Sequence, residues 1–200
     1  MKRMSTTQLD TMTMLELPLR TGRWAADPAH SAVLFSIRHL GLAKVRGRFD
    51  RFEAALAVGP TMAETRVEAT IDLDSIDTNN ADRDAHLRST DFFSTEIHPT
   101  MRFVSTEISG AEGDWRLFGE ITLNGVTRPI AFGVEFNGRE EFPGQNRYHA
   151  GFSATGVLRR SEFGIDFGML PLSADKLALG DEVKIELDLE FVEPQGDTEN

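Results

Sequence analysis

The segment RDAHLRSTDFF, residues 83–93, begins with a charge quartet of Arg83, Asp84, His86 and Arg88 and ends with two adjacent phenylalanines. A histidine close to a carboxylate can act as a general acid–base pair, and His86 follows Asp84 by two positions. Together with Arg83 and Arg88, these side chains could instead hold the polar head group of a ligand at the mouth of a cavity. The structural alternative is a tie between a helix and its neighbours, because buried charges must be paired. Since ion-pair networks commonly serve structure, the segment favours the structural interpretation.

The other residues capable of chemistry form no recognisable site. Five histidines are scattered along the chain: His30, His39, His86, His98 and His149. No two of them have the i, i+4 spacing of helical zinc ligands, and Asp84 and His86 point apart if they share a helix. Imidazole and carboxylate groups bind zinc, copper or iron only where the fold brings them together. Ser31 and Ser161 lie outside any Gly-x-Ser-x-Gly elbow. The sequence therefore predicts no catalytic residue and no metal site.

The composition favours one domain with a dry interior. A chain of 200 residues fits a single domain and can bury roughly 70% of its unfolded surface. Its aromatic residues are 14 Phe, two Trp and one Tyr, and Phe adds apolar area without a polar group. The net charge is −11 with no run of Lys or Arg, which disfavours nucleic acid and anionic membrane surfaces as partners. The chain has no Cys, so disulfides, thiol catalysis and Cys-ligated zinc are excluded.

The first twenty residues, MKRMSTTQLDTMTMLELPLR, begin with basic residues but contain no apolar run of about seven or more. Asp10 and Glu16 interrupt the apolar residues, whereas a secretory signal needs a continuous apolar core and a small-residue cleavage site. No stretch of about 18 apolar residues occurs elsewhere, so no membrane span is predicted. We therefore expect a cytoplasmic protein.

Alternation of apolar and polar residues dominates the rest of the chain. In RVEATIDLDS, residues 66–75, apolar side chains alternate with charged and polar ones. Similar runs lie at residues 33–38, 101–108, 115–123, 126–136, 148–154 and 183–191. Such period-two runs are typical of antiparallel strands with one face toward solvent. The sequence predicts an all-β fold with one short helix, in which the strands close into a barrel.

Short turn signals punctuate these runs. They are Gly59-Pro60, Ser109-Gly110, Asn124-Gly125, Asn137-Gly138 and Pro143-Gly144. Asn124-Gly125 lies between two alternating runs and is the strongest hairpin signal in the chain.

Two segments break the alternation. Residues 81–92 are predicted as a short helix capped by Asn80, with Asp82 and Asp84 where the helix dipole favours negative charge. We expect this helix to lie over the barrel mouth. Residues 163–180 are predicted as a long apolar connection, and long ordered loops of this kind are often functional. Both segments are expected to gate entry to the barrel.

Several motifs in one order carry a family resemblance. They are DPAHSAVLFSIRHLGLAKVRGRF, VEATIDLDSIDTNNADRDAHLRSTDFF, HPTMRFVS, GEITLNGVTRPI and RRSEFGID. In this order they resemble the YceI-like family, from about Trp24 to Phe191. The resemblance implies an extended, lipocalin-like antiparallel β-barrel that binds a long polyisoprenoid chain, such as an isoprenoid quinone, in an elongated apolar tunnel. Many members of that family are periplasmic or secreted.

The resemblance also divides the chain. We predict a disordered N-terminal tail at residues 1–20, a YceI-like lipid-binding β-barrel domain at 21–193 and a C-terminal tail at 194–200. A homodimer is a further expectation from the resemblance.

Apolar side chains, most of them Phe, are predicted to line the tunnel together with two helix residues at its mouth. The predicted ligand-binding residues are Phe35, Ile37, Phe49, Ile71, His86, Leu87, Phe92, Phe93, Met101, Phe103, Ile121, Phe132, Phe152, Phe163, Phe167 and Met169. Each buried CH₂-sized group contributes about 0.8 kcal/mol, so such a tunnel can hold a lipid without directed polar contacts. The predicted function is binding, storage or transport of a long-chain isoprenoid lipid, of the quinone or polyprenyl type, without catalysis and without a cofactor.

Two alternatives remain open. An enzyme acting on an apolar substrate in the barrel would use His86 with Asp84 as its acid–base pair. A structural or stress protein would hold no ligand, because a small barrel is normally filled by its own side chains.

Overall fold

The computed structural model describes residues 18–111, 114–173 and 176–195. Most of the predicted N-terminal tail, residues 1–17, and the last five residues of the predicted C-terminal tail lie outside the described residues. Among the described residues, no helix has both the length and the apolar character needed to span a membrane.

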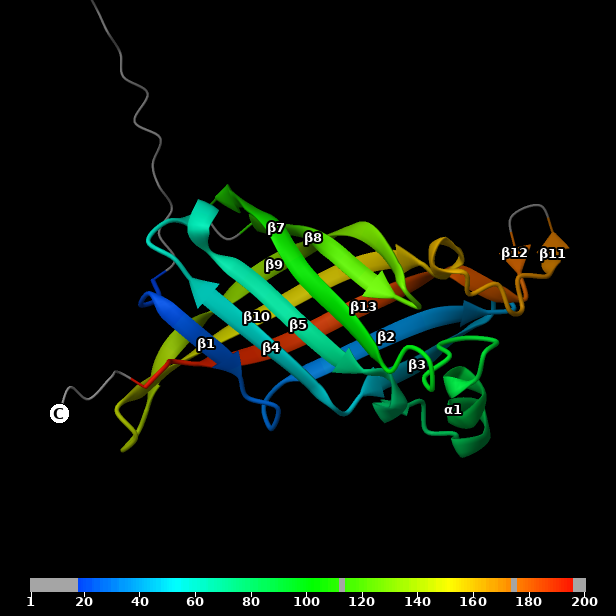
Figure 1. Cartoon of the computed structure of the whole chain (residues 1–200), viewed down its shortest axis with the longest axis horizontal. Coiled ribbons are helices and arrows are strands. Elements are labelled where there is room, and N and C mark those ends of the chain that lie inside the picture. The colour runs from blue at the N-terminus through cyan, green and yellow to red at the C-terminus, as the bar shows by residue number, and fades with distance from the viewer. Residues whose placement is uncertain (1–17, 112–113, 174–175, 196–200) are drawn as a thin grey trace, which may run out of the picture.

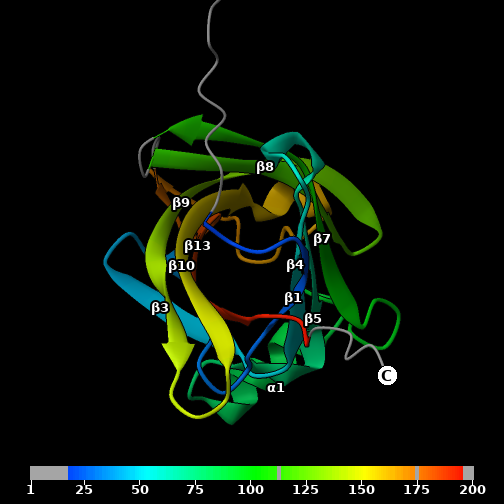
Figure 2. The same cartoon turned by 90° about the vertical axis from the view of Figure 1, so that its left-hand side faces the viewer.

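Antiparallel strands close into a barrel. Its strands, in the order of their hydrogen-bonded neighbours, are β1 (Gly22–Ala26), β4 (Phe52–Val58), β5 (Arg66–Asp72), β7 (Thr100–Ala111), β8 (Asp114–Leu123), β9 (Val126–Phe142), β10 (Arg147–Arg159) and β13 (Leu179–Val192). The pairs Ala25–Val192 and Ala26–Phe191 join β1 to β13 and complete the ring. Figure 2 looks into this ring from one end. Within the described residues the barrel has eight strands, and the prediction of an all-β barrel with a short helix is confirmed.

The sheet broadens at the other end of the barrel. There β13 pairs with β2 (Ala32–His39), which pairs with β3 (Ala43–Phe49) and through it with β6 (Ile76–Asp77). The helix α1 (Ala81–Arg88) follows β6, and the small hairpin of β11 (Pro171–Ser173) and β12 (Lys176–Leu177) precedes β13. Figure 1 shows α1 and this hairpin at the same end of the barrel. The short helices η1 (Met62–Glu64), η2 (Leu73–Ser75) and η3 (Arg160–Phe163) complete the elements.

Two of the predicted turns illustrate how glycine acts in this fold. Asn124 and Gly125 both have positive φ, 51° and 73°, and form the two-residue connection between β8 and β9 as predicted. Asn137-Gly138, in contrast, does not end a strand, because β9 runs through it. Gly138 has a φ of 125° and faces Gly151 where the β9–β10 register shifts, which is a bulge. The predicted turn was wrong because a glycine with positive φ serves a bulge as well as a turn.

The helix α1 begins where the sequence predicts and ends earlier. The Asn80 side chain accepts a hydrogen bond from the Arg83 backbone nitrogen at 2.9 Å, which confirms the predicted cap. The helix stops at Arg88, whereas the sequence predicts it to residue 92. Ser89 explains the difference, because its hydroxyl and its backbone nitrogen both donate to the His86 carbonyl and close the last turn.

The hydrophobic core divides along the barrel axis. One cluster fills the centre and the α1 end, and it includes Phe49, Phe92 and Phe163. The other surrounds Trp24 at the opposite end and includes Leu19. Because Leu19 is buried, and because Arg139 Nη1 donates to the Pro18 carbonyl at 2.8 Å, residues 18–20 pack on the barrel instead of belonging to the predicted tail.

Candidate functional site

Two adjoining cavities lie inside the barrel. The smaller has a volume of about 130 Å³, and every residue that lines it is apolar. The larger, about 460 Å³, lies at the α1 end, where β2, β3 and α1 contribute to its wall. Val33, Met101 and Ile185 line both cavities, so these three side chains form the waist between them. The interior is therefore an elongated apolar space, narrow at one end and wide at the other.

The strands place most of the predicted ligand-binding residues on these cavities. Six of the predicted residues line the smaller cavity: Ile71, Met101, Phe103, Ile121, Phe132 and Phe152. The larger is lined by Phe35, Ile37, Phe49, His86, Leu87, Phe92, Phe93 and Phe167, and again by Met101. Period-two alternation explains the strand residues, since it sends every second side chain inward.

Phe163 and Met169 line neither cavity. Phe163 is 2% exposed and belongs to the packed core, and it ends the short helix η3, where period-two alternation does not apply. Met169 is half-buried in the turn that follows, and its backbone nitrogen donates to the Asp166 carbonyl.

Several lining residues were missed although their signal was available. Trp115, Leu117 and Val134 lie in alternating runs and line the smaller cavity, as do Leu187 and Leu189. These residues alternate with polar ones as regularly as the predicted Phe residues do, so alternation alone is enough to identify them.

Arg160 is a cation buried beside the larger cavity. It is 3% exposed and donates to four backbone carbonyls, those of Ile165, Phe167, Leu179 and Gly180, at 2.7–3.0 Å. Burial lowers the pKa of this guanidinium, while the negative charges of Asp181 and Asp166 oppose the shift. Because its donors are directed at the 163–180 segment, Arg160 holds that segment against the barrel.

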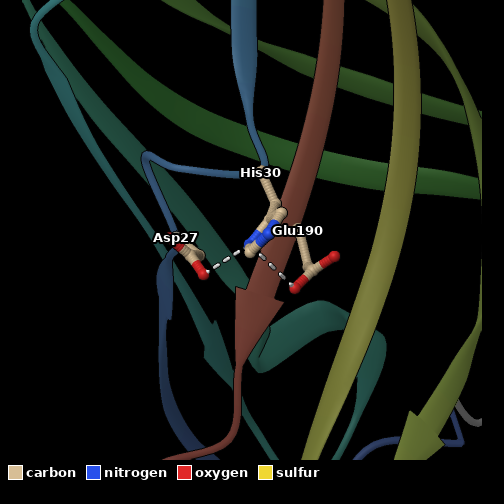
Figure 3. Close-up of side chains that lie close together, drawn as sticks. All are labelled: Asp27, His30 and Glu190. Atoms are coloured by element: carbon tan, nitrogen blue, oxygen red, sulfur yellow. Dashed lines mark hydrogen bonds and ion pairs between the residues drawn. The ribbon is translucent and has the colours of Figure 1, made fainter. Parts of the chain in front are cut away.

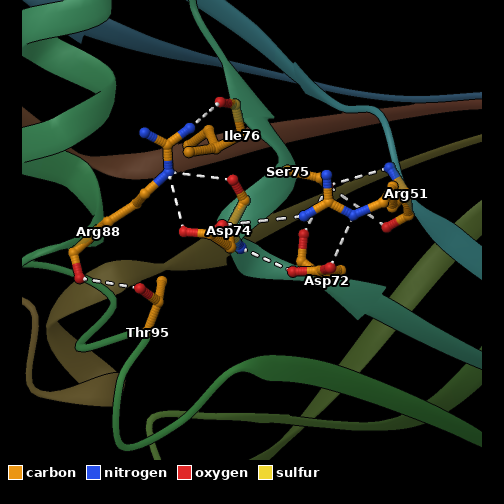
Figure 4. A network of polar contacts seen from close by, with 7 residues as sticks. All are labelled: Arg51, Asp72, Asp74, Ser75, Ile76, Arg88 and Thr95. Carbon is orange, nitrogen blue, oxygen red and sulfur yellow. Dashed lines mark hydrogen bonds and ion pairs between the residues drawn. The ribbon is translucent and has the colours of Figure 1, made fainter.

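The charged residues of α1 are largely structural ties, as the sequence favours. Arg83 donates to the Thr78 hydroxyl and carbonyl, both at 2.7 Å. Asp84 is buried and accepts from the backbone nitrogen and the hydroxyl of Thr78. Arg88 donates to the carbonyls of Asp74 and Ile76 at 3.0 and 3.1 Å (Figure 4). The helix is thereby fixed to the segment that precedes it.

A third arginine, Arg51, extends this network to the neighbouring strand ends. Arg51 Nε lies 2.8 Å from Asp72 Oδ2, and the Ser75 hydroxyl accepts from the Arg51 backbone nitrogen at 3.0 Å (Figure 4). These contacts join the start of β4 to the end of β5 and to η2, and the Asp74 carbonyl of η2 in turn accepts from Arg88 of α1.

His86 and Asp84 do not form the acid–base pair of the enzymatic alternative. The Nε2 atom of His86 lies 2.8 Å from Asp91 Oδ2, while Asp84 is engaged by Thr78. The pair of that alternative is not formed, because residues two apart on a helix point in different directions. The His86 ring instead meets the rings of Phe92 and Phe167 edge-on, at centroid distances of 5.1 and 4.7 Å.

The sequence of this chain is similar to a family of known proteins. The profile described as "YceI-like domain" matches residues 24–191. The chain belongs to the YceI-like family. A UPF0312 protein of Staphylococcus epidermidis is 38% identical to this YceI-like chain over 166 residues, which cover 82% of the chain and 94% of the relative. A UPF0312 protein of Pectobacterium atrosepticum is 37% identical over 147 residues, covering 73% and 76%.

Solved structures show the same fold. BcnA of Burkholderia cenocepacia superimposes with a TM-score of 0.68 at 23% identity, over 82% of this chain and 98% of that one. The YCEI protein of Campylobacter jejuni gives 0.67 at 22%, over 98% and 100%. A polyisoprenoid binding domain from Saccharophagus degradans gives 0.62 at 15%, over 86% and 98%.

A separate polar cluster lies on the surface of this YceI-like barrel. His30 Nδ1 lies 2.9 Å from Asp27 Oδ2 and 3.8 Å from Glu190 Oε1, and these atoms lie within 4.8 Å of one another (Figure 3). His149 Nδ1 contacts the same Glu190 oxygen at 2.7 Å. The hydrogen bond between His30 and Asp27 raises the pKa of His30 and lowers the pKa of Asp27.

Each member of this cluster could offer one ligand atom to a cation, although the hydrogen bonds already pair these atoms. The cluster was missed in the sequence because Glu190 is far from Asp27 and His30 along the chain. Its role in the structure is to pin the loop between β1 and β2 to β13.

Proposed function

We propose that this YceI-like domain binds a long-chain isoprenoid lipid inside the barrel and stores or carries it without chemical change. The observation that carries the proposal is the pair of adjoining cavities, one lined only by apolar residues and the other mostly so, joined at the waist of Val33, Met101 and Ile185. A polyisoprenoid binding domain of the same fold supports the assignment of the ligand class.

The sizes of the cavities suit a chain-like ligand. The larger, about 460 Å³, falls in the range of roughly 300–1,000 Å³ typical of small-molecule sites. The smaller, about 130 Å³, is close to the roughly 150 Å³ of a dry apolar cavity that accepts benzene. Each buried CH₂-sized group adds about 0.8 kcal/mol, so a prenyl tail that fills both cavities is bound mainly by burial.

The polar residues suggest the orientation of the lipid. Arg83 and His86 line the larger cavity, and the smaller cavity has no polar residue in its wall. A quinone, alcohol or phosphate head would therefore lie at the α1 end, and the tail would point toward the smaller cavity. Arg83 is held here by Thr78 and His86 by Asp91, so both side chains have fixed positions in the cavity wall.

Native mass spectrometry of the full chain, purified without detergent and followed by organic extraction, tests the proposal. We expect an apolar adduct at one copy per chain, with a mass in the isoprenoid series, or uptake of an added isoprenoid quinone. An unliganded mass together with no uptake would overturn the proposal and favour a structural protein without a ligand.

A matched pair of variants adds a second test. Ala154→Phe puts a large side chain into the smaller cavity, and we expect it to lower quinone binding by about tenfold or more, because the tail loses buried groups. Ala131→Phe makes the same substitution on the exposed outer face of the neighbouring strand β9 and should bind like the parent. Equal binding by both variants would mean that the tail does not reach the smaller cavity.

A further inference from the structure

Four exposed leucines lie at the α1 end of the barrel, and we refer to them as the leucine rim. They are Leu40 and Leu42, in the turn between β2 and β3, and Leu170 and Leu172, in and next to β11. Leu42 is 80% exposed and Leu170 is 68% exposed. Large exposed apolar residues that gather in one place mark an interaction surface more often than scattered ones do.

Backbone hydrogen bonds hold the leucine rim together. The Leu40 nitrogen donates to the Ala178 carbonyl, and the Ala178 nitrogen donates to the Leu170 carbonyl, each at 2.8 Å. His39 pairs with Leu179 in the sheet directly beside them. The two segments of the rim, about 130 residues apart in sequence, therefore form one fixed surface.

The leucine rim borders the larger cavity. His39 and Ala178 line that cavity and are chain or hydrogen-bond neighbours of Leu40. Phe167 and Gly168 line it also and precede Leu170 by two or three residues. Phe167 is 47% exposed, so its ring faces the cavity on one side and solvent on the other. A lipid that passes beside Phe167 would emerge at the leucine rim.

Four exposed cations lie next to the rim, and we refer to them as the basic strip. They are Arg38, Lys44, Arg46 and Lys176. Arg38 and Lys44 are direct cross-strand partners at the end of the β2–β3 hairpin, where like charges repel. None of the four forms an ion pair with any residue in the part of the chain that the structure describes. Glu186, whose charge acts on Lys44 and Arg46, is paired with Lys184 at 2.6 Å.

We propose that the leucine rim and the basic strip dock the protein onto an anionic lipid bilayer. The exposed leucines enter the interface, and the unpaired cations meet lipid phosphates, as in other surface-bound proteins. The net charge of −11 disfavours such a surface as a partner when the sequence alone is considered. The fold alters that expectation locally, because the β2–β3 hairpin exposes Arg38, Lys44 and Arg46, and the hydrogen bond from Leu40 to Ala178 places Lys176 near them, beside the larger cavity.

Docking in this orientation extends the proposed function, because the larger cavity would then open toward the membrane that holds the lipid. The docking surface itself does not depend on the identity of the bound lipid. The two proposals can therefore fail separately, and the experiment measures them separately.

Co-sedimentation of the full chain with vesicles tests the docking. We expect binding to vesicles of equal parts phosphatidylcholine and phosphatidylglycerol, weaker binding to phosphatidylcholine alone, and loss of the difference at high salt. Lys44→Glu with Arg46→Glu should weaken binding to the anionic vesicles by about tenfold or more. Leu42→Glu with Leu170→Glu should weaken it similarly, because the apolar contact is lost.

Matched control variants carry the same changes elsewhere. Arg102→Glu with Arg116→Glu reverses two exposed charges on the outer face of β7 and β8, and Phe142→Glu replaces an exposed apolar residue far from the rim at the end of β9. Both controls should bind vesicles like the parent.

Three results would overturn the docking proposal. The parent could bind anionic and neutral vesicles equally, or the rim and strip variants could bind like the controls. The rim variant could also convert a dimer to a monomer with no vesicle binding by any form, which would make the rim a contact between two copies. The rim, strip and control variants should all take up an isoprenoid quinone, added without vesicles, as the parent does. If the parent itself takes up no quinone, that result counts against the proposed function alone.

Discussion

At the residue scale, Arg160 shows how one side chain can stabilise a whole connection. Its four hydrogen bonds to carbonyls reach both ends of the 163–180 segment, at Ile165 and Phe167 and at Leu179 and Gly180. A buried carbonyl without a donor is costly, so these interactions decide where the segment lies. The segment in turn supplies Phe167 and Gly168 to the cavity wall.

Arg160→Met should therefore destabilise the fold. We expect a loss of about 3 kcal/mol or more in the free energy of unfolding, because several buried carbonyls lose their donor. Urea unfolding measures the difference. Arg159→Met is the matched control, since Arg159 is exposed and its ion pair with Glu182 is exposed too, so its effect should be close to zero. A loss of similar size in both variants would contradict the role assigned to Arg160.

The Asp27–His30 pair makes the stability of the fold depend on pH, and the two pKa shifts determine the direction. The raised pKa of His30 means that its contribution to stability is present below the ordinary pKa of histidine and is lost as the pH rises through its folded pKa. The lowered pKa of Asp27 means that its contribution is present above the ordinary pKa of aspartate and is lost as the pH falls through its folded pKa. The pair is therefore most stabilising in the weakly acidic window between the two.

Asp27→Asn tests this window. The substitution keeps the side-chain oxygen that accepts from the Ala29 nitrogen but removes the charge that faces His30. We expect it to destabilise the protein more at about pH 5 than at about pH 8, measured by urea unfolding. The same substitution in a His30→Gln background should show no such difference. A larger effect at the higher pH would mean that the charge pair is not the cause.

At the scale of elements, most of the long strands could be predicted from alternation, whereas β1, β3 and β4 and many strand ends could not. Val67, Ala69 and Ile71 line the smaller cavity because alternation along a strand reports directly which side chains point inward. The same rule fails for Phe163, which lies in a short helix, and it cannot distinguish the bulge at Gly138 from a turn. The local sequence determines whether side chains alternate along a strand, whereas the residue at which the strand ends depends on tertiary contacts.

The cap of α1 is an element-scale feature with a measurable energy. Asn80→Ala should lower the free energy of unfolding by about 1 kcal/mol, because the Arg83 backbone nitrogen loses its acceptor. Asn80→Asp keeps an acceptor at the same position and should have little effect. Thermal unfolding compares the two variants. Equal losses in both would show that the side-chain oxygen does not cap the helix.

At the scale of the whole molecule, the sequence could not show which distant residues meet. Asp27 and His30 lie next to Glu190, and the turn at Leu40 lies next to Leu170, only because β13 passes beside β1 and β2. The family and the barrel could be predicted from ordered motifs and alternation. The polar cluster depends on a pairing across most of the chain, and so does the position of Lys176 near the turn at Leu40, and a single sequence contains no signal for either. The other three cations of the basic strip, Arg38, Lys44 and Arg46, are close together in the sequence and share one hairpin.

The place of β13 in the chain order also determines when the barrel and its cavities can form. Among the described strands it is the last in chain order, yet it pairs with β10 on one side and with both β1 and β2 on the other. During synthesis, β1 and β2 can pair early with β4 and β3, but their second partner, β13, is made much later. Contacts so distant in sequence slow folding, and they leave apolar strand faces uncovered in the meantime. The barrel cannot enclose a ligand until β13 is in place, so under the proposed function loading follows the synthesis of β13.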